Sequence, residues 1–200
     1  MKFIFIRHGK DDDRYRGGWS DLDINDEGKK QAKELASYLE DNNFNIKKII
    51  TSDLKRALNT TNIINEKLNL LIELDSNLRE MNNGDLAGML NDEALIKYPG
   101  LFFNTLDMNE KYPNGESPIE FYNRIKKWFN NTINEYNSMD GNIAIITHAG
   151  VINIIYYIVN NLEWSNKAKI FKIDNCSIHI LDLSTMTFEV ENYIKYLETK

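Results

Sequence analysis

Lys2-Phe3-Ile4-Phe5-Ile6-Arg7-His8-Gly9, near the start of the 200-residue chain, sets four consecutive large apolar residues before a cation, an imidazole and a glycine. Such a run predicts a strand that is buried on both faces of a parallel sheet. Ligands of open α/β sheets bind at the carboxyl ends of strands, and a glycine there lets backbone or ligand approach closely. We therefore expect Arg7 to hold an anion and His8 to act on it. An edge strand with a polar tip is the alternative that these eight residues leave open.

Length, charge and cysteine content narrow the class of protein. A chain of 200 residues predicts one α/β domain over residues 1–200. The net charge of −6 argues against non-specific binding to nucleic acid or anionic membranes, because such binding needs a basic face. No apolar run is long enough to span a bilayer. The single cysteine, Cys176, and an N-terminal apolar run too short for a signal peptide predict a cytoplasmic location.

Arginine is scarce in a chain that otherwise uses lysine for positive charge. Of 24 basic residues, six are arginines: Arg7, Arg14, Arg16, Arg56, Arg79 and Arg124. Each is a candidate for a task that needs a planar fork, such as bidentate binding of phosphate or carboxylate. For any one of them, chance remains the alternative.

Hydrophobic periodicity and cap signals predict strands that alternate with helices. Strands are expected over 47–51, 70–74, 143–147, 170–173, 176–183 and 188–194, and helices over 26–40, from 52, over 91–98, from 117 and from 151. The best helix start is the capping box Ser117-Pro118-Ile119-Glu120, with proline at the first helical position. This order of elements indicates an α/β fold.

Three predicted strand ends and one loop carry chemically active side chains. The strand ends deliver Arg7-His8-Gly9, Ser52-Asp53 with Arg56 on the following helical turn, and His148-Ala149-Gly150, and the loop delivers Glu80. If the strands are parallel neighbours, these groups converge in one crevice. Two arginines and helix N-termini favour a phosphate dianion. A neutral histidine can attack phosphorus in line, and a carboxylic acid can protonate the leaving oxygen.

Together these segments resemble the histidine phosphatase superfamily, in its phosphoglycerate mutase-like branch. Five ordered motifs carry the resemblance: Arg7-His8-Gly9; Gly18-Trp19-Ser20-Asp21 with Gly28 and Gln31-Ala32; Ser52 to Ala57 with Thr60; Leu78-Arg79-Glu80 with Gly84 and Gly88; and Gly115-Glu116-Ser117 with Thr147 to Gly150. Asn175-Cys176-Ser177 is also similar to the family's late strand. One triplet alone would be unspecific, whereas five motifs in order are specific.

The resemblance implies a three-layer α/β/α sandwich, phosphoglycerate mutase-like, with a mostly parallel central sheet. It implies that His8 is the phosphorylated nucleophile and Glu80 the proton donor. Arg7, Arg56 and a catalytic His148 would bind the transferring phosphoryl group. No metal and no cofactor are expected, because these cationic groups supply the charge neutralisation that Mg²⁺ supplies elsewhere. Possible substrate contacts are Lys10, Arg14, Trp19 and Ser20.

The chain departs from the family pattern beside the nucleophile. Lys10-Asp11 stands where the family commonly has glutamate, glutamine or alanine followed by threonine or serine, and Arg14 stands where many members have asparagine. Asp11, Asp12 and Asp13 therefore place negative charge near the site. Two explanations remain open: a solvated acidic loop partly neutralised by its basic neighbours, or selection against polyanionic substrates and for one with an amine. His179, inside a predicted strand with no cap or glycine, is expected to be a structural residue.

The predicted function is a metal-independent phosphomonoesterase that hydrolyses a small phosphorylated metabolite through phosphohistidine. A cofactor-dependent phosphoglycerate mutase-type transferase and a non-catalytic phosphate-binding protein are the alternatives. Hydrolysis is favoured because only Lys97 and Lys111 lie between Leu86 and Glu116 to hold a second anion, and because no long basic tail precedes Lys200 to exclude water. The expected partner is a small phosphorylated substrate, not nucleic acid or a membrane. The leaving group and the oligomeric state do not follow from the sequence.

Overall fold

The computed structural model describes residues 1–168 and 170–197, and a six-stranded sheet lies at its centre. The strands are β1 (Lys2–Arg7), β2 (Ile46–Thr51), β3 (Ile72–Leu74), β4 (Asn142–Thr147), β5 (Ile178–Asp182) and β6 (Thr187–Tyr193). Their order across the sheet is β3-β2-β4-β1-β5-β6. The first four strands run parallel to one another, and β5 and β6 pair antiparallel at one side. The predicted, mostly parallel sheet is confirmed.

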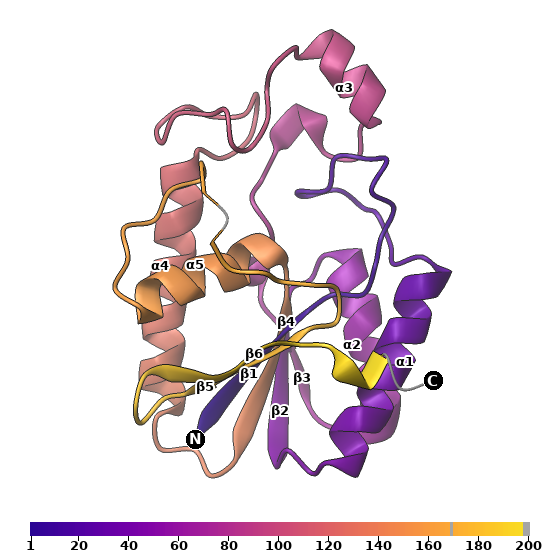
Figure 1. Cartoon of the computed structure of the whole chain (residues 1–200), viewed down its shortest axis with the longest axis vertical. Helices are drawn as coiled ribbons and strands as arrows, with labels where there is room; N and C mark the ends of the chain where they lie inside the picture. The colour runs from indigo at the N-terminus through magenta and orange to yellow at the C-terminus, as the bar shows by residue number, and fades with distance from the viewer. Residues whose placement is uncertain (169, 198–200) are drawn as a thin grey trace.

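Helices cover both faces of this sheet. They are α1 (Asp26–Asp41), α2 (Lys55–Leu68), α3 (Asn91–Lys97), α4 (Pro118–Tyr136) and α5 (Ala149–Val159), and short 3₁₀ turns occupy Ser76–Leu78, Gly84–Leu86 and Lys195–Leu197. Figure 1 shows α1 and α2 on one side of the sheet and α4 and α5 on the other. The expected three-layer α/β/α sandwich is therefore confirmed.

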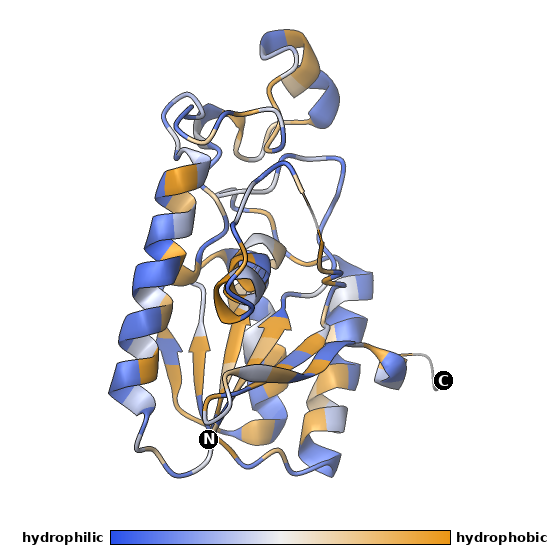
Figure 2. Ribbon diagram, turned by 60° about the vertical axis from the view of Figure 1, so that its left-hand side comes forward, coloured by the Kyte–Doolittle hydropathy of each residue, from blue (hydrophilic) through white to orange (hydrophobic). Residues whose placement is uncertain are grey.

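Strand β1 contributes side chains to both interlayer cores. Phe3 and Phe5 pack in the core shared with α4 and α5, whereas Ile4 and Ile6 pack with α1 and α2, because successive side chains of a strand point to opposite faces. Burying each of these side chains contributes about 1.5–3 kcal/mol. Figure 2 shows the strands as mainly hydrophobic ribbons between helices of mixed hydropathy. The uninterrupted apolar run is thus explained by burial on two faces.

Two predicted helix starts are confirmed by their cap hydrogen bonds. The side chain of Asn25 accepts from the Gly28 amide at 2.9 Å and begins α1. Ser117 and Glu120 form the predicted capping box at the start of α4, with Pro118 at its first position. Each cap satisfies backbone donors that the helix itself leaves free, a contribution of about 1 kcal/mol.

Two other predicted elements differ from the structure. Helix α2 begins at Lys55 instead of at Ser52-Asp53, and its N-cap residue makes no side-chain cap bond. Ser52 and Asp53 are engaged elsewhere, with His148 and Arg79 respectively. The strand predicted over 170–173 is wrong, because this irregular segment turns a backbone carbonyl toward the arginine that ends β1 instead of joining the sheet.

The sheet order fixes where the carboxyl ends of the central strands lie. Since β4 lies between β1 and β2, and all three run parallel, their last residues meet at one edge. In Figure 1, α3 and the irregular segments around it lie above this edge. Among the described residues, no helix is both long and apolar enough to cross a bilayer.

Candidate active site

His8 follows β1 directly and is buried, with 4% of its surface exposed. Its Nδ1 lies 2.7 Å from the carbonyl oxygen of Gly9, and since a carbonyl only accepts, Nδ1 carries the proton of the neutral ring. The lone pair is therefore on Nε2. Burial first, and then the charges of Arg56 and Arg7, hold the pKa of His8 well below its usual range. The ring is thus neutral and presents Nε2 as a nucleophile.

Arg56 reaches this nitrogen from the first turn of α2. Its Nε donates to His8 Nε2 at 3.3 Å, and its Nη2 donates to the Gly18 carbonyl at 2.8 Å. The third nitrogen, Nη1, is buried and has no hydrogen-bond partner among the described residues. A buried cationic donor without a partner is costly, so this nitrogen marks a place for an anion beside the nucleophile.

His148 follows β4 and lies next to His8, with ring centroids 5.0 Å apart. Its Nε2 lies 2.9 Å from Ser52 Oγ, and that hydroxyl already accepts from the Leu54 amide at 3.3 Å. We assign the hydroxyl proton to the bond with Nε2 and the ring proton to Nδ1, which has no partner in the described structure. Burial, then the charge of Arg56, lowers the pKa of His148 well below its usual range. The ring is neutral, and its buried Nδ1 is free to bond an anion.

Arg7 completes the set of donors around His8. Its Nη1 donates to the carbonyl of Ile173 at 2.9 Å, while its Nε is buried and unpaired among the residues described. The backbone of the nucleophile is held from the same side, because the Cys176 amide donates to the Arg7 carbonyl at 3.0 Å. The site therefore offers three unpaired donors on two guanidiniums and one imidazole, which suits a phosphoryl group.

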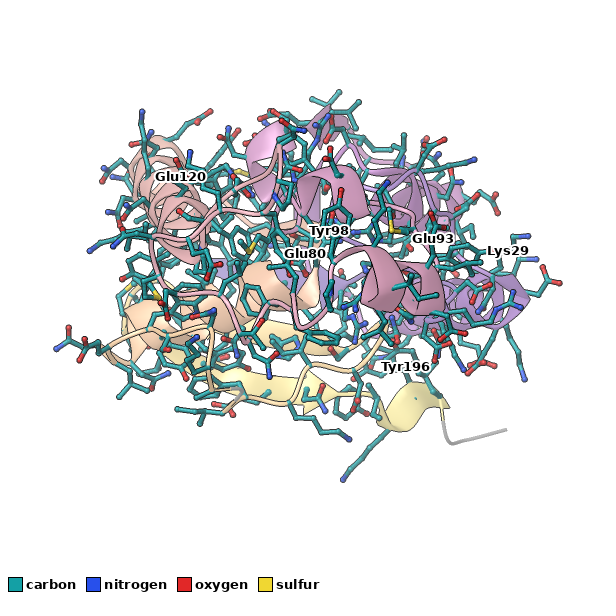
Figure 3. The ribbon with its side chains drawn as sticks, turned by 90° about the horizontal axis from the view of Figure 1, so that it is seen from above. Lys29, Glu80, Glu93, Tyr98, Glu120 and Tyr196 are labelled. Atoms are coloured by element: carbon teal, nitrogen blue, oxygen red, sulfur yellow. The ribbon has the colours of Figure 1, made fainter. Side chains whose placement is uncertain are left out.

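Glu80 lies in the loop that the sequence predicts to carry the acid. Its carboxylate accepts from the Gly150 amide at 3.0 Å and from the Met81 amide at 3.1 Å. A Cβ at Gly150 would lie 2.2 Å from Glu80 Oε1, so only glycine permits this approach. Seen from above, Glu80 lies near the middle of the molecule, between Glu120 of α4 and Glu93 of α3 in that view (Figure 3).

The loop of Glu80 is braced by residues of two other segments. Trp19 Nε1 donates to the Glu80 carbonyl at 2.7 Å, and Arg124 Nη2 donates to the same oxygen at 3.2 Å. Arg124 also forms two 2.8 Å bonds with the carboxylate of Glu116. Trp19, predicted as a possible substrate contact, thus holds the backbone that carries Glu80.

Close backbone packing fixes the segment after the nucleophile. A Cβ on Gly9 would lie 2.6 Å from the Gly28 carbonyl oxygen, and one on Gly28 would lie 2.2 Å from the carbonyl oxygen of Lys10. The Gly9 amide donates to Thr60 Oγ1 at 3.0 Å, and that hydroxyl donates to the carbonyl of Arg56 at 2.7 Å. Thr60 therefore links the nucleophile segment to the helix that carries the arginine.

A cavity of about 420 Å³ opens from the site. Arg7, Glu80 and Gly150 line its phosphoryl end, and apolar and aromatic residues line much of the rest: Met81, Phe103, Tyr112, Trp164, Phe171 and Ile173. Arg16 is a further cation on its wall. Sequence reasoning missed Phe103 and Tyr112 because their segment has no clear period, and Phe171 and Ile173 because their segment is predicted as a strand, although the scarcity of arginine did mark Arg16 as a candidate.

None of the four possible substrate contacts lines this cavity. Lys10 pairs with Glu27 at 2.6 Å, and Arg14 is exposed and pairs with Asp12 at 2.6 Å. Trp19 supports the Glu80 loop as described, and Ser20 is buried with an unpaired hydroxyl. Arg16, and not Arg14, lies on the cavity wall.

The three aspartates of the acidic loop lie in different surroundings. Asp11 Oδ2 is 3.6 Å from Arg56 Nε, so this carboxylate stands at the edge of the anion site. Asp12 is paired with Arg14, and Asp13 is exposed. The solvated-loop explanation therefore fits Asp12 and Asp13, whereas Asp11 belongs to the electrostatics of the site.

Comparisons with known proteins identify the family of this chain. The model of the histidine phosphatase superfamily (branch 1) matches residues 3–195. Phosphoserine phosphatase 1 of Hydrogenobacter thermophilus is 29% identical over 189 residues, which cover 92% of this chain and 87% of that protein. Phosphoglycerate mutase-like protein 4 of Arabidopsis thaliana is 29% identical over 207 residues, covering 98% and 87%. The chain therefore belongs to the histidine phosphatase superfamily, in its branch 1.

Solved structures show the same fold. The alpha-ribazole phosphatase from Shigella flexneri superposes with a TM-score of 0.82 over 96% of each chain, at 22% sequence identity. At this identity the likeness establishes the fold alone. It agrees with the layer order and with the mostly parallel sheet described above.

Proposed function

We propose that this protein is a metal-independent phosphomonoesterase that acts on a small phosphorylated metabolite through a phosphohistidine at His8. The observation that carries the proposal is the environment of His8 Nε2, a lone pair beside unpaired donors of Arg7, Arg56 and His148. A non-catalytic phosphate-binding protein has no need of a buried neutral nucleophile among these donors. The chain's membership of a phosphatase superfamily supports the same activity.

The first half of the proposed reaction transfers the phosphoryl group to His8. Nε2 attacks phosphorus in line, the P–O bond to the leaving group breaks, and Glu80 in its acid form gives the departing oxygen a proton. Arg7, Arg56 and His148 stabilise the negative charge on the three equatorial oxygens through preorganised donors. The cations stand in place before the reaction, so little reorganisation is required.

The second half releases phosphate. Glu80, now a carboxylate, takes a proton from water, and that water attacks the phosphohistidine and restores His8 Nε2 as a lone pair. The position of Glu80 on the cavity wall, bonded to the amide two residues after His148, suits both roles.

Hydrolysis is favoured over isomerisation by the scarcity of cations around the leaving group. A mutase must hold a bisphosphorylated intermediate through reorientation, which needs further cationic contacts. In the described part of the chain, Lys97 is exposed, Lys111 pairs with Glu120, and neither lines the cavity. Arg16 is the cation on the cavity wall in addition to Arg7.

The test is phosphoenzyme trapping followed by product analysis, with a chelator present throughout. Brief incubation with labelled phosphate ester should label His8 with a phosphate that is stable in alkali and lost in acid, and His8→Ala should not be labelled. Acid-stable label on serine, or a requirement for added metal ion, would contradict the proposal. With 3-phosphoglycerate and 2,3-bisphosphoglycerate, formation of 2-phosphoglycerate faster than phosphate release would establish a mutase instead.

We further propose that residues 1–200 act as one domain in the cytoplasm, with a small phosphorylated molecule as partner. The family model spans nearly the whole sequence, and the single cysteine, Cys176, is buried and free. Burial raises the pKa of its thiol to about 12, so it is an unreactive core residue.

A further inference from the structure

The cavity is large for the leaving group of a three-carbon phosphate ester. Its volume of about 420 Å³ falls within the range of about 300–1,000 Å³ typical of pockets that bury drug-sized ligands. Beyond the phosphoryl end, the wall carries the rings of Phe103, Tyr112, Trp164 and Phe171. A small acid such as glycerate would leave most of these rings without contact, whereas a flat apolar body would cover them.

The aromatic wall is held in place by its own contacts. Trp164 is 8% exposed and stacks on Tyr122 with ring centroids 5.4 Å apart. The side-chain amide of Asn166 donates to the carbonyls of Phe103 and Leu106 at 2.6 and 2.8 Å, which ties the two wall segments together. The wall is thus preorganised, and a ligand does not have to order it on binding.

Arg16 supplies a positive charge on the same wall. The Arg16 amide donates to the Met89 carbonyl at 2.8 Å and the Arg16 carbonyl accepts from the Gly88 amide at 2.7 Å, so its backbone is fixed. Its guanidinium lies 4.4 Å from the ring centroid of Phe102, and its buried Nε has no partner among the described residues. Since Arg7 binds the phosphoryl group in the proposed reaction, Arg16 is the cation available to bind the leaving group.

We infer that the leaving group combines a flat, apolar body, typically aromatic, with one carboxylate that binds Arg16. This inference rests on the proposed phosphatase activity and specifies its substrate class as phosphate monoesters of carboxylated aromatic alcohols. A single guanidinium matches a single carboxylate through its fork, and Arg16 and Arg7 are the cationic residues that line the cavity.

The experiment compares four phosphate esters: phenyl phosphate, 3-carboxyphenyl phosphate, 4-carboxyphenyl phosphate and phosphoserine. The variants are Arg16→Gln and, as a matched control, Arg14→Gln, because Arg14 lies two positions away, is exposed and is outside the cavity. For each variant, the ratio of kcat/KM between carboxylated and plain ester is divided by the same ratio in the wild type, which cancels the intrinsic reactivity of the leaving groups.

In the wild-type protein, at least one carboxyphenyl ester should exceed phenyl phosphate in kcat/KM by about tenfold to a hundredfold, as expected for a hydrogen bond to a charged group. Arg16→Gln should lower that ratio to about one, while Arg14→Gln should keep it at the wild-type value. Phe103→Ala should raise KM for all the phenyl esters but leave inhibition by orthovanadate unchanged, because vanadate occupies only the phosphoryl end.

Failure of this inference can be distinguished from failure of the proposed function. If phenyl phosphate is hydrolysed but the carboxylate gives no advantage, or the advantage survives Arg16→Gln, the assignment of Arg16 is overturned. If phosphoserine has a higher kcat/KM than every phenyl ester, the apolar body is overturned. If no ester is hydrolysed at all, the phosphatase activity itself is wrong.

Discussion

The protein has buried histidines in two regions of one sheet, and the two regions differ in the hydrogen bonds of the ring nitrogens and their neighbours. In the antiparallel part, His179 has both nitrogens bonded. Its Nδ1 accepts from Tyr156 Oη at 2.8 Å and from the Asn192 amide at 3.2 Å, and its Nε2 lies 2.8 Å from Ser177 Oγ. Both nitrogens of this ring are hydrogen-bonded within the protein, as predicted for a structural residue, so neither is available to a ligand.

In the parallel part, the pair of His8 and His148 is incomplete. His148 Nδ1 has no partner in the described structure, and His8 Nε2 faces only the guanidinium of Arg56. Burial lowers the pKa of all three histidines, that of His179 to about 4. Burial and a shifted pKa therefore do not separate a reactive histidine from a structural one. What sets the pair of His8 and His148 apart is the set of buried nitrogens in and around it that have no partner among the described residues: Arg7 Nε, Arg56 Nη1 and His148 Nδ1.

The largest expected effect comes from exchanging one histidine in each region. His8→Asn should lower kcat by more than about 10⁴-fold, because the covalent route is lost. His179→Asn should leave kcat/KM close to that of the wild type but lower the free energy of unfolding by about 1–3 kcal/mol, since buried partners lose their bonds. Turnover of p-nitrophenyl phosphate and urea unfolding measure the two effects. A folded His179→Asn protein without activity would contradict the assignment of His179 as a structural residue.

Glu80→Gln sharpens the assignment of the parallel region as the reacting one. Removing a proton donor costs about 10²- to 10⁴-fold when the leaving group needs a proton and much less when it does not. Hydrolysis of an alkyl phosphate should therefore fall far more than hydrolysis of p-nitrophenyl phosphate, with the two esters compared in the same preparation. Equal losses on both esters would assign Glu80 to binding.

Arg56→Lys tests whether geometry or charge matters beside the unpaired nitrogens. Lysine keeps the charge but cannot bond His8, the Gly18 carbonyl and an anion with one planar group. We expect kcat/KM to fall roughly ten- to a hundredfold. Arg14→Lys, at the exposed pair with Asp12, should change nothing. Near-normal activity in Arg56→Lys would show that the mechanism does not need the planar guanidinium of Arg56.

Added phosphate should distinguish the histidines of the two regions by its effect on their pKa values. Because the folded-state pKa values are lowered, the unfolded chain binds protons first as pH falls below about 6.5, and stability is lost in that direction by about 1.4 kcal/mol per pH unit for each histidine. Inorganic phosphate should raise the pKa values of His8 and His148 but not that of His179. Histidine NMR between pH 7 and 5, with and without phosphate, measures this. A shift of the His179 resonances with phosphate would contradict the comparison.

The smallest expected effect is at the edge of the anion site. Asp11 lies 3.6 Å from Arg56 and competes with a bound anion for its charge. Because this carboxylate is partly exposed, its removal is expected to strengthen the binding free energy of the anion by up to about 1 kcal/mol. Asp11→Asn should lower the inhibition constant of phosphate by up to about fivefold, and exposed Asp13→Asn should not. An unchanged inhibition constant in Asp11→Asn would show that Asp11, like Asp12 and Asp13, belongs to a solvated loop with no influence on the anion site.

The sequence predicts which residues lie together because their positions depend on local order. Arg7 ends β1, His8 and His148 directly follow β1 and β4, and Arg56 lies in the first turn of the helix after β2, so parallel pairing of β1, β4 and β2 is enough to bring them together. The cavity wall could not be predicted in this way. Its residues come from irregular segments, and long-range bonds such as the one from Asn166 to the Phe103 carbonyl set their positions.

The errors in the predicted elements have a related cause. Ser52 has the composition of a helix cap, yet its hydroxyl bonds His148, whose place beside it depends on a strand far along the chain. The apolar run over 170–173 has the composition of a strand, but Ile173 gives its carbonyl to Arg7 instead of to a ladder. In both cases a tertiary contact with the site outweighs the local preference.

The central position of β1 has a consequence for how the protein comes into being. Phe3 pairs with Ile143 on one side and with Leu181 on the other, and the Cys176 amide holds the carbonyl of Arg7. During synthesis the first strand emerges long before either neighbour, and such distant pairings form slowly. A nascent or truncated chain thus carries His8 without its anion site. Catalytic competence is acquired only when the last third of the polypeptide has joined the sheet.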